Sequence, residues 1–292
     1  MDILQPTPRA LRISRIGFQV SDLDAACAFY IEALGFSPAP HGAPRSSARL
    51  LRLGEQEIEL IAPDAPGAPY PSPRAANDPW FQHFAIAVSD MAAAYQQLTR
   101  YGAEPISHGG PQRLPPSTGS VIAYKFRDPD GHPLELSYLP GSEWLRRPRA
   151  HGPFLGVDHT AVAVGELETS VAFYTAVLGF RLGGRSLNRG PEQDRLDGLS
   201  EAQVDIVSLE TAGPGPHIEL LHYRTPRPTA PRPVGASDIA ATRTTVVVRS
   251  LPMGGAGSLG LSSEPADRGI RLRDPDGHRL ELQVEGAGDQ SG

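Results

Sequence analysis

The sequence predicts an α+β fold of four modules, each made of a strand, a helix and three further strands. Alternating apolar runs typical of strands recur along the chain, as at 157–164. The motif Phe-Tyr-x3-Leu-Gly-Phe occurs at 29–36 and at 173–180, and Asp-Pro-Asp-Gly-His-x-Leu-Glu-Leu occurs at 128–136 and at 274–282. The second copies follow the first by 144 and 146 residues, so a half of about 145 residues, itself two similar modules, occurs twice.

The first module sets the order of elements for the other three. Ser21-Asp22 after the first strand is a typical helix cap, and Gly35 ends the helix that follows. A hairpin through Gly54-Glu55 joins its last two strands. The expected elements are a strand at 12–20, a helix to 34, a short strand near 36, and strands at 49–53 and 57–61.

The repeat divides the chain into two halves. Segments rich in Pro, Gly and Arg read as the connections between modules. The expected ranges are 1–140 for the first half with modules 12–62 and 81–139, 141–156 for a linker, 157–284 for the second half with modules 157–223 and 240–284, and 285–292 for a flexible tail.

The turns and loops of the later modules are also predictable. Pro-Asp-Gly is a strong turn signal before the last strand of each half, and His132 and His278 in these turns are expected to be structural. The run Gly254-Gly255-Ala256-Gly257 lacks the strand-then-helix frame of a phosphate-binding loop. We expect it to be a plain loop.

Composition excludes several classes of function. The net charge of -6 argues against a nucleic-acid partner, because such proteins usually carry a basic face. No apolar run reaches the length of a membrane span, and the N-terminus lacks the plan of a signal peptide, so we expect a cytoplasmic protein with no membrane partner. The single cysteine, Cys27, forms no internal disulfide and is expected to be a small core residue.

The four modules and the two repeated motifs resemble the vicinal oxygen chelate superfamily over about residues 12 to 284. That superfamily includes glyoxalase I, extradiol dioxygenases and metal-free bleomycin-binding proteins, so the resemblance implies the fold more strongly than the reaction. In the family, two modules form a cup, and each gives the cup one residue from its first strand and one from its last. The matching positions here are Arg15 and Glu59, His83 and Glu135, His159 and Glu219, and Arg243 and Glu281.

The pairing of modules decides which cup could hold a metal ion. If neighbouring modules pair, each cup holds one His, two Glu and one Arg, and a fixed cation then stands where a ligand belongs. If the second module pairs with the third, one cup receives both histidines, and in the other two guanidinium groups neutralise two carboxylates. We favour this second pairing. It gives one active cup of His83, Glu135, His159 and Glu219, and one degenerate cup of Arg15, Glu59, Arg243 and Glu281.

Two imidazoles and two carboxylates suit one divalent ion such as Zn, Ni, Co, Mn or Fe. The resemblance implies a lyase or isomerase of glyoxalase type, in which the ion chelates adjacent oxygens of a small carbonyl substrate and stabilises an enediolate. Glu135 is the expected base, with Glu219 as the alternative. An Fe(II)-dependent dioxygenase and a metal-free binding or resistance protein remain open, as do a monomer and a homodimer.

Further residues are expected to line the active cup. The polar segment 187–195 reads as a loop that covers it, and His217 lies on the same strand face as Glu219. Trp80 and Tyr223 are expected to wall the pocket. The candidate substrate contacts are Asn188, Arg189, Glu192, Gln193, His217 and Tyr223.

Overall fold

The computed structural model describes residues 10–40, 47–65, 67–80, 82–147, 152–228, 234–251, 263–266 and 269–286. The glycine-rich run expected as a loop at 254–257, part of the expected linker at 148–151, and residues 287–292 of the expected tail lie outside these ranges. None of the helices in the described ranges is long and apolar enough to cross a membrane.

The first half of the chain contains two modules. The first consists of β1 (Ala10–Gln19), α1 (Leu23–Leu34), β2 (Ser37–Pro38), β3 (Ala48–Leu53) and β4 (Gln56–Ile61). The second consists of β5 (Gln82–Val88), α2 (Met91–Thr99), β6 (Glu104–Pro105), β7 (Gln112–Arg113), β8 (Ile122–Arg127) and β9 (Pro133–Tyr138), with short 3-10 turns at Pro116–Thr118 and Glu143–Arg146.

In the second half, the third module follows this order with one added helix, and the described part of the fourth contains strands only. The third module has β10 (Phe154–Ala163), α3 (Leu167–Ala172) with a π-helical turn at Phe173–Val177, β11 (Arg181–Arg189), α4 (Pro191–Asp197), β12 (Gln203–Glu210) and β13 (His217–Thr225). The described part of the fourth module has β14 (Arg243–Val248), β15 (Ser263–Ala266), β16 (Gly269–Arg273) and β17 (Arg279–Val284).

Local sequence signals explain the ends of α1. The Asp22 side chain accepts hydrogen bonds from the backbone N–H groups of Asp24 and Ala25, which satisfies two amides at the start of the helix. Gly35 adopts φ 73°, the left-handed conformation in which the helix ends. The helix predicted from Ser21-Asp22 and Gly35 is therefore confirmed.

The segment 187–195 is not the loop that its polarity suggested. It forms the end of β11 and most of α4. Pro191 begins the helix, where its missing N–H is no disadvantage, and Gly198 ends it at φ 62°. Both signals were present in the sequence, and the error came from reading polarity as irregular structure.

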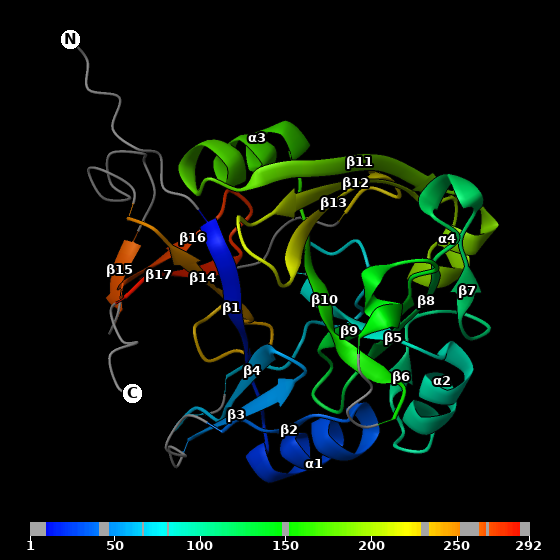
Figure 1. Cartoon of the computed structure of the whole chain (residues 1–292), viewed down its shortest axis with the longest axis horizontal. Coiled ribbons are helices and arrows are strands. Elements are labelled where there is room, and N and C mark those ends of the chain that lie inside the picture. The colour runs from blue at the N-terminus through cyan, green and yellow to red at the C-terminus, as the bar shows by residue number, and fades with distance from the viewer. Residues whose placement is uncertain are drawn as a thin grey trace.

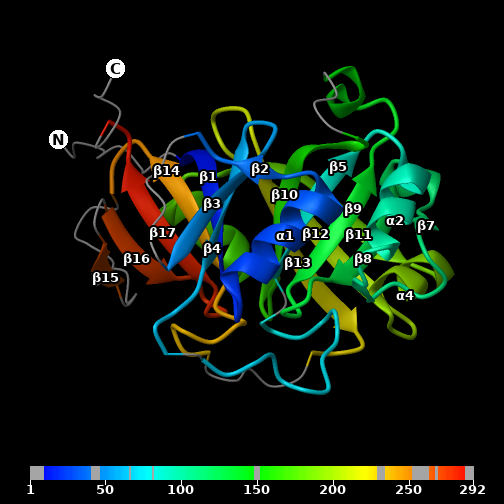
Figure 2. The same cartoon turned by 90° about the horizontal axis from the view of Figure 1, so that it is seen from below.

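Two mixed sheets organise the strands, and Figures 1 and 2 show them side by side. One has eight strands in the order β15-β16-β17-β14-β1-β4-β3-β2. The other has nine, in the order β11-β12-β13-β10-β5-β9-β8-β6, with β7 added beside β8. The first module thus pairs with the fourth and the second with the third, so the pairing favoured from the distribution of histidines is confirmed.

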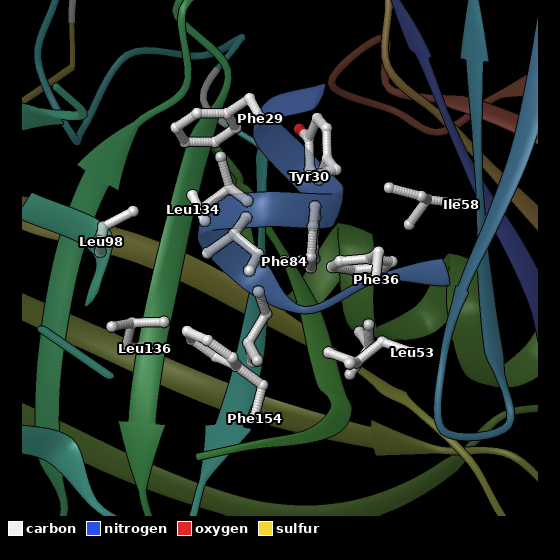
Figure 3. Close-up of a cluster of buried hydrophobic side chains, with 14 of the residues drawn as sticks. Phe29, Tyr30, Phe36, Leu53, Ile58, Phe84, Leu98, Leu134, Leu136 and Phe154 are labelled. Carbon is white, nitrogen blue, oxygen red and sulfur yellow. The ribbon is translucent and has the colours of Figure 1, made fainter. Parts of the chain in front are cut away.

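The two largest hydrophobic cores are each built mainly from modules of the same half, with a few residues of β10 or β1 from the other half. In Figure 3, Tyr30 and Phe36 of the first module pack with Phe84 and Leu134 of the second. A second core joins β10 and β13 with β14 and β17 through residues such as Val246. Each large apolar side chain buried there contributes about 2 kcal/mol, so both sheets are held firmly against each other.

Helix α4 joins the two edges of the nine-stranded sheet. It follows β11 at one edge, and at the other edge the Ser107 hydroxyl donates to the Leu196 carbonyl at 2.8 Å. The backbone N–H of His108 donates to the Arg195 carbonyl at 2.7 Å, and Arg195 Nε donates to Gln112 Oε1 at 2.7 Å. The curved sheet is thereby closed into a cup.

Candidate metal centre

The four active-cup residues predicted from the sequence come from four adjacent strands of the nine-stranded sheet. His83 on β5 and His159 on β10 stand opposite Ala161 and Ala85 in the antiparallel register. Glu135 on β9 stands beside Ala85, and Glu219 on β13 beside Ala161. The two alanines are fully buried and add little side-chain volume between the four residues. We call His83, Glu135, His159 and Glu219 the histidine cup.

Three of these residues lie close enough to share one ion. Possible ligand atoms of His83, Glu135 and His159 all lie within 4.8 Å of one another, and the three residues are buried. His83 Nε2 is 3.5 Å from Glu135 Oε2. Glu219 contacts the group through His159, with 3.6 Å between His159 Nε2 and Glu219 Oε2. Imidazole and carboxylate donors at this spacing fit a borderline divalent ion.

Neighbouring side chains orient these potential ligands. His159 Nδ1 donates to Asp158 Oδ2 at 2.9 Å, which turns Nε2 towards the centre of the cup. Trp144 donates its indole N–H to the same carboxylate. Regular strand alternation would place Asp158 and His159 on opposite faces, but an irregularity in the β10–β5 register between Val157 and His159 brings them together.

The electrostatic field of the cup is negative. Burial lowers the pKa of His159, but Glu219 and Asp158 outweigh burial and raise that pKa to about 9. The same field that holds a proton on His159 favours a divalent cation. Burial lowers the pKa of His83, and Lys125 lowers it further against the influence of Glu135, so this imidazole is neutral at pH 7.

The two glutamates are anionic despite their surroundings. Burial alone would raise the pKa of Glu135, but His83 and Lys125 hold it well below its usual range. The Ser137 hydroxyl donates to Glu135 Oε1 at 2.5 Å. Burial also opposes the charge of Glu219, and His159 with His217 lowers the pKa of that carboxyl.

Sequence reasoning missed a buried ion pair beside the cup. Lys125 stands opposite Glu135 in the β8–β9 register, with its Nζ 3.9 Å from Glu135 Oε2. The same Nζ lies 2.7 Å from Asp197 Oδ1 on α4, and Gln193 Nε2 donates to the other oxygen of Asp197 at 2.7 Å. A lysine between Tyr124 and Phe126 on a strand was the available signal, but its partner lies on a helix that the sequence did not predict.

The structure separates the six expected substrate contacts into two groups. Asn188 is buried on the cup face of β11, opposite Val204, and accepts a hydrogen bond from Ser186 at 3.0 Å. Tyr223 is buried on the same face of the sheet, and burial raises the pKa of its hydroxyl well above the usual value. Gln193 belongs to the buried Asp197 network, and His217 Nε2 is 3.5 Å from Glu219 Oε1.

Three residues expected at the cup lie elsewhere. Arg189 is exposed, because it follows Asn188 on the strand and so points to the other face. Glu192 lies on the outer side of α4, 3.7 Å from Arg195. Trp80 packs with Tyr70 and Ile239 in a separate cluster.

The equivalent positions of the eight-stranded sheet form a second cup, Arg15, Glu59, Arg243 and Glu281, which we call the arginine cup. Arg15 and Arg243 both contact Glu59, at 3.6 and 3.1 Å. Arg243 Nε lies 3.5 Å from Glu281 Oε2, and Arg271 Nε lies 3.1 Å from the same oxygen. Arg15 also reaches Glu57 at 3.6 Å. Three guanidinium groups and three carboxylates therefore neutralise one another.

A family model described as the Glyoxalase/Bleomycin resistance protein/Dioxygenase superfamily matches residues 12–136 and 156–282 of the chain. Lactoylglutathione lyase GLX1 of Arabidopsis thaliana is 27% identical over 210 residues, which cover 69% of this chain and 66% of that protein. The chain therefore spans slightly less than two thirds of the length of this relative. Virulence protein STM3117 of Salmonella typhimurium is 28% identical over 130 residues, which cover 43% of this chain and 83% of that protein.

The solved structures give the same picture of the fold. A mutant form of glyoxalase I from Zea mays matches with a TM-score of 0.64 and 19% identity, covering 94% of this chain and 92% of that chain. At this identity the likeness concerns the fold alone. It extends over both tandem halves.

Proposed function

Since the chain belongs to the glyoxalase, bleomycin resistance protein and dioxygenase superfamily, we propose that its histidine cup binds one divalent metal ion and catalyses a reaction of the glyoxalase type. The reaction is a lyase or isomerase step on a small carbonyl substrate with adjacent oxygens. The convergence of His83, Glu135 and His159 from both halves of the chain carries this proposal.

The chemistry of the side chains suggests which residues would bind the ion and which would orient the ligands. His83, His159 and Glu135 would hold the ion, and its Lewis acidity would polarise the carbonyl and stabilise an enediolate. Asp158 keeps His159 in the tautomer that presents Nε2 to the cup. Ser137 keeps Glu135 in place.

The geometry favours Glu219 as the base, whereas the sequence placed Glu135 first. Glu135 is fixed by Ser137 and lies within the compact group of three. The side chain of Glu219 is 22% exposed, against 10% for Glu135, and contacts the group at its edge through His159. A carboxylate beside the ion that does not need to leave it can accept the substrate proton directly. His217, 3.5 Å from Glu219, is placed to receive that proton in turn.

Metal analysis of the purified protein tests the metal site. The wild type should carry about one ion per chain, and His83→Ala and His159→Ala should each lose it, because each removes one imidazole from the same site. Arg243→Ala, at the position of the fourth module equivalent to His83, is the matched control and should keep the ion. Loss of metal in only one of the two histidine variants would contradict the proposal that both imidazoles bind the same ion.

Proton exchange tests the chemistry independently of the final product. With an α-hydroxyketone in deuterated water, NMR should detect exchange of the hydrogen next to the carbonyl. Glu219→Gln should slow this exchange about 100-fold or more while keeping the ion, because it removes the base and no imidazole. If Glu135→Gln removes exchange without removing metal and Glu219→Gln does neither, the roles are the reverse of those proposed.

A second candidate is an Fe(II)-dependent dioxygenase. Two histidines and one carboxylate with Glu219 set apart is the ligand pattern of many non-haem iron oxygenases. Oxygen consumption with catechol-type substrates after loading with Fe(II) would favour this reaction. A chain that holds no ion at all would instead be a metal-free binding or resistance protein.

A further inference from the structure

The two Pro-Asp-Gly turns of the repeat differ in what covers them. In the first half, the hydroxyl of Tyr70 lies 3.1 Å from His132 Nδ1, and the two rings meet edge to face at 5.6 Å. A Cβ atom on Gly131 would lie 2.1 Å from a guanidinium nitrogen of Arg74 and 3.3 Å from the Tyr70 ring. An aromatic ring and a charged side chain therefore fill the space over this turn.

Among the described residues, no side chain fills the equivalent space in the second half. Gly277 occupies the position of Gly131, and no atom of the described residues lies within 4 Å of a Cβ built on it. A cleft of about 290 Å³ lies over this turn, close to the size of a small-molecule site. Its described lining is Pro79, Trp80, Gln82, Val234, Ala240, Ala241, Thr242, Arg273, Asp276, Gly277, His278 and Arg279.

The histidines of the two turns are held alike. His278 Nε2 lies 2.7 Å from the Ala163 carbonyl, as His132 Nε2 lies 2.8 Å from the Gln19 carbonyl. His132 uses its other nitrogen for the Tyr70 hydroxyl. His278 lines the cleft at the same place, so the cleft matches the space that Tyr70 fills in the first half.

The charges also differ between the turns. Arg127 of the first half pairs with Glu104 at 3.1 Å, and Arg74 reaches the same carboxylate at 2.6 Å. Arg273 is the counterpart of Arg127, and within the described residues neither it nor Arg279 forms an ion pair with a carboxylate. Their hydrogen bonds go to the backbone carbonyls of Val234 and Gly277.

The acidic residue of the cleft does not neutralise this pair. Asp276 accepts hydrogen bonds from the Gly165 amide at 2.8 Å and the Ser170 hydroxyl at 2.9 Å. Burial lowers the pKa of Arg279, and the like charge of Arg273 lowers it further, while the carboxylates of Glu264 and Asp238 act against this shift. An anion between the two guanidinium groups would relieve this repulsion.

We propose that the cleft between Trp80 and the Gly277 turn binds a small aromatic carboxylate. The ring takes the place that the Tyr70 side chain has over the first turn, against His278 and Trp80. The carboxylate takes the place of Glu104 and accepts hydrogen bonds from Arg273 and Arg279. Apolar surface for the ring comes from Pro79, Val234 and Ala240.

This site is separate from the histidine cup and does not depend on the proposed function. Gln82 lines the cleft, whereas His83, the next residue of β5, points to the other face of the strand and into the cup. Gln82 Nε2 also donates to Thr244 Oγ1 at 3.0 Å across to the other sheet. A ligand in the cleft therefore lies where the two sheets meet.

Calorimetric titration of the full chain with benzoate tests the proposal. Benzoate should bind saturably at about one site per chain. Benzyl alcohol, which lacks the charge, and acetate, which lacks the ring, should each bind at least tenfold more weakly. The His83→Ala variant should bind benzoate as the wild type does, which excludes coordination to a metal ion in the cup.

Substitutions in the cleft test whether benzoate binds there. Arg273→Gln/Arg279→Gln should weaken benzoate binding at least tenfold, whereas Arg224→Gln, an exposed arginine paired with Asp205, should not change it. If the double variant fails to fold, Ala240→Leu keeps all charges, fills the cleft and should weaken binding to the same extent. Absence of saturable binding in the wild type, unchanged binding in Ala240→Leu or in a folded double variant, or loss of binding in His83→Ala would each overturn the proposal.

Discussion

The histidine cup and the arginine cup share a backbone plan and differ in the charges at equivalent positions. Both take two residues from first strands and two from last strands of paired modules. In the arginine cup, the guanidinium groups of Arg15, Arg243 and Arg271 stand against an equal number of carboxylates. Lys125 is a permanent cation beside the histidine cup, but its ammonium group is already paired with the carboxylate of Asp197.

We infer from this difference that imidazole ligands together with an excess of negative charge, rather than the fold, would decide which cup takes a cation. Without metal, a proton on His159 supplies part of the missing positive charge, as its pKa of about 9 indicates. The arginine cup needs neither a proton nor a metal ion, because its own side chains balance it.

The largest expected effect comes from replacing the two arginines of the arginine cup with the histidines that stand at the equivalent positions of the histidine cup. In Arg15→His/Arg243→His, imidazoles stand at the positions equivalent to His159 and His83, and the protein should bind about two ions per chain instead of one. A micromolar second site would represent ~8 kcal/mol of binding free energy that the wild-type arginine cup lacks. Metal titration measures it, and Arg271→Gln in addition should tighten it by releasing Glu281.

The matched control for this gain is Arg15→Gln/Arg243→Gln, which removes the same charges without adding a ligand. This variant should still bind about one metal ion per chain. Equal uptake by the glutamine and histidine variants would mean that charge alone, without imidazole, selects the cup.

A smaller effect distinguishes the ion pairs of the two cups. Lys125→Met should destabilise the metal-free protein by about 3 kcal/mol, because Asp197 is left charged in a buried position. Arg271→Gln in the arginine cup should cost less than ~1 kcal/mol, since the Arg271 side chain is 46% exposed. Urea unfolding measures both, and Lys125→Met/Asp197→Asn should recover part of the loss. Equal effects of the two single variants would contradict the difference in burial.

A further difference between the cups is a dependence of stability on pH that only the histidine cup should show. The folded pKa of His159 is about 9, above the ordinary value of about 6.5. The protonated imidazole therefore stabilises the metal-free protein fully below about pH 6.5, and this stabilisation, of the order of 3 kcal/mol, is lost as the pH rises through 9. Urea midpoints of chelator-treated protein at several pH values measure it.

In His159→Gln this loss between pH 6.5 and 9 should disappear, whereas Arg15→Gln at the equivalent position should leave it intact, because an arginine keeps its charge throughout this range. Bound metal should reverse the trend, since the ion and the proton compete for the same nitrogen. A metal-free wild type that gains stability over this range would contradict the negative field assigned to the cup.

The sequence was sufficient for the modules and for their pairing, because both leave a repeated signal. Histidine at two of four equivalent positions, with arginine at the other two, separated the cups before any geometry was known. The ends of α1 could be predicted from Asp22 and Gly35 for a different reason. Helix caps depend on residues close together in the sequence.

The residues that tune the cup could not be predicted in this way. Asp158 reaches His159 only because the register of β10 is irregular there, and strand alternation alone points the two apart. Lys125 owes its burial to Asp197, which is 72 residues away on α4. Such contacts depend on how distant elements pack, and no local pattern along the chain records them.

Each sheet joins modules of both halves, whereas each large core comes mainly from one half, and this difference bears on the origin of the chain. Each half supplies most of one core, but each cup needs both halves. A half-length ancestor, like a relative that matches 43% of this chain, would therefore have built cups only as a twofold symmetric dimer, with two identical sites. A single chain with two tandem halves is free of that symmetry, so its two cups can carry different side chains at equivalent positions, as the histidine cup and the arginine cup do.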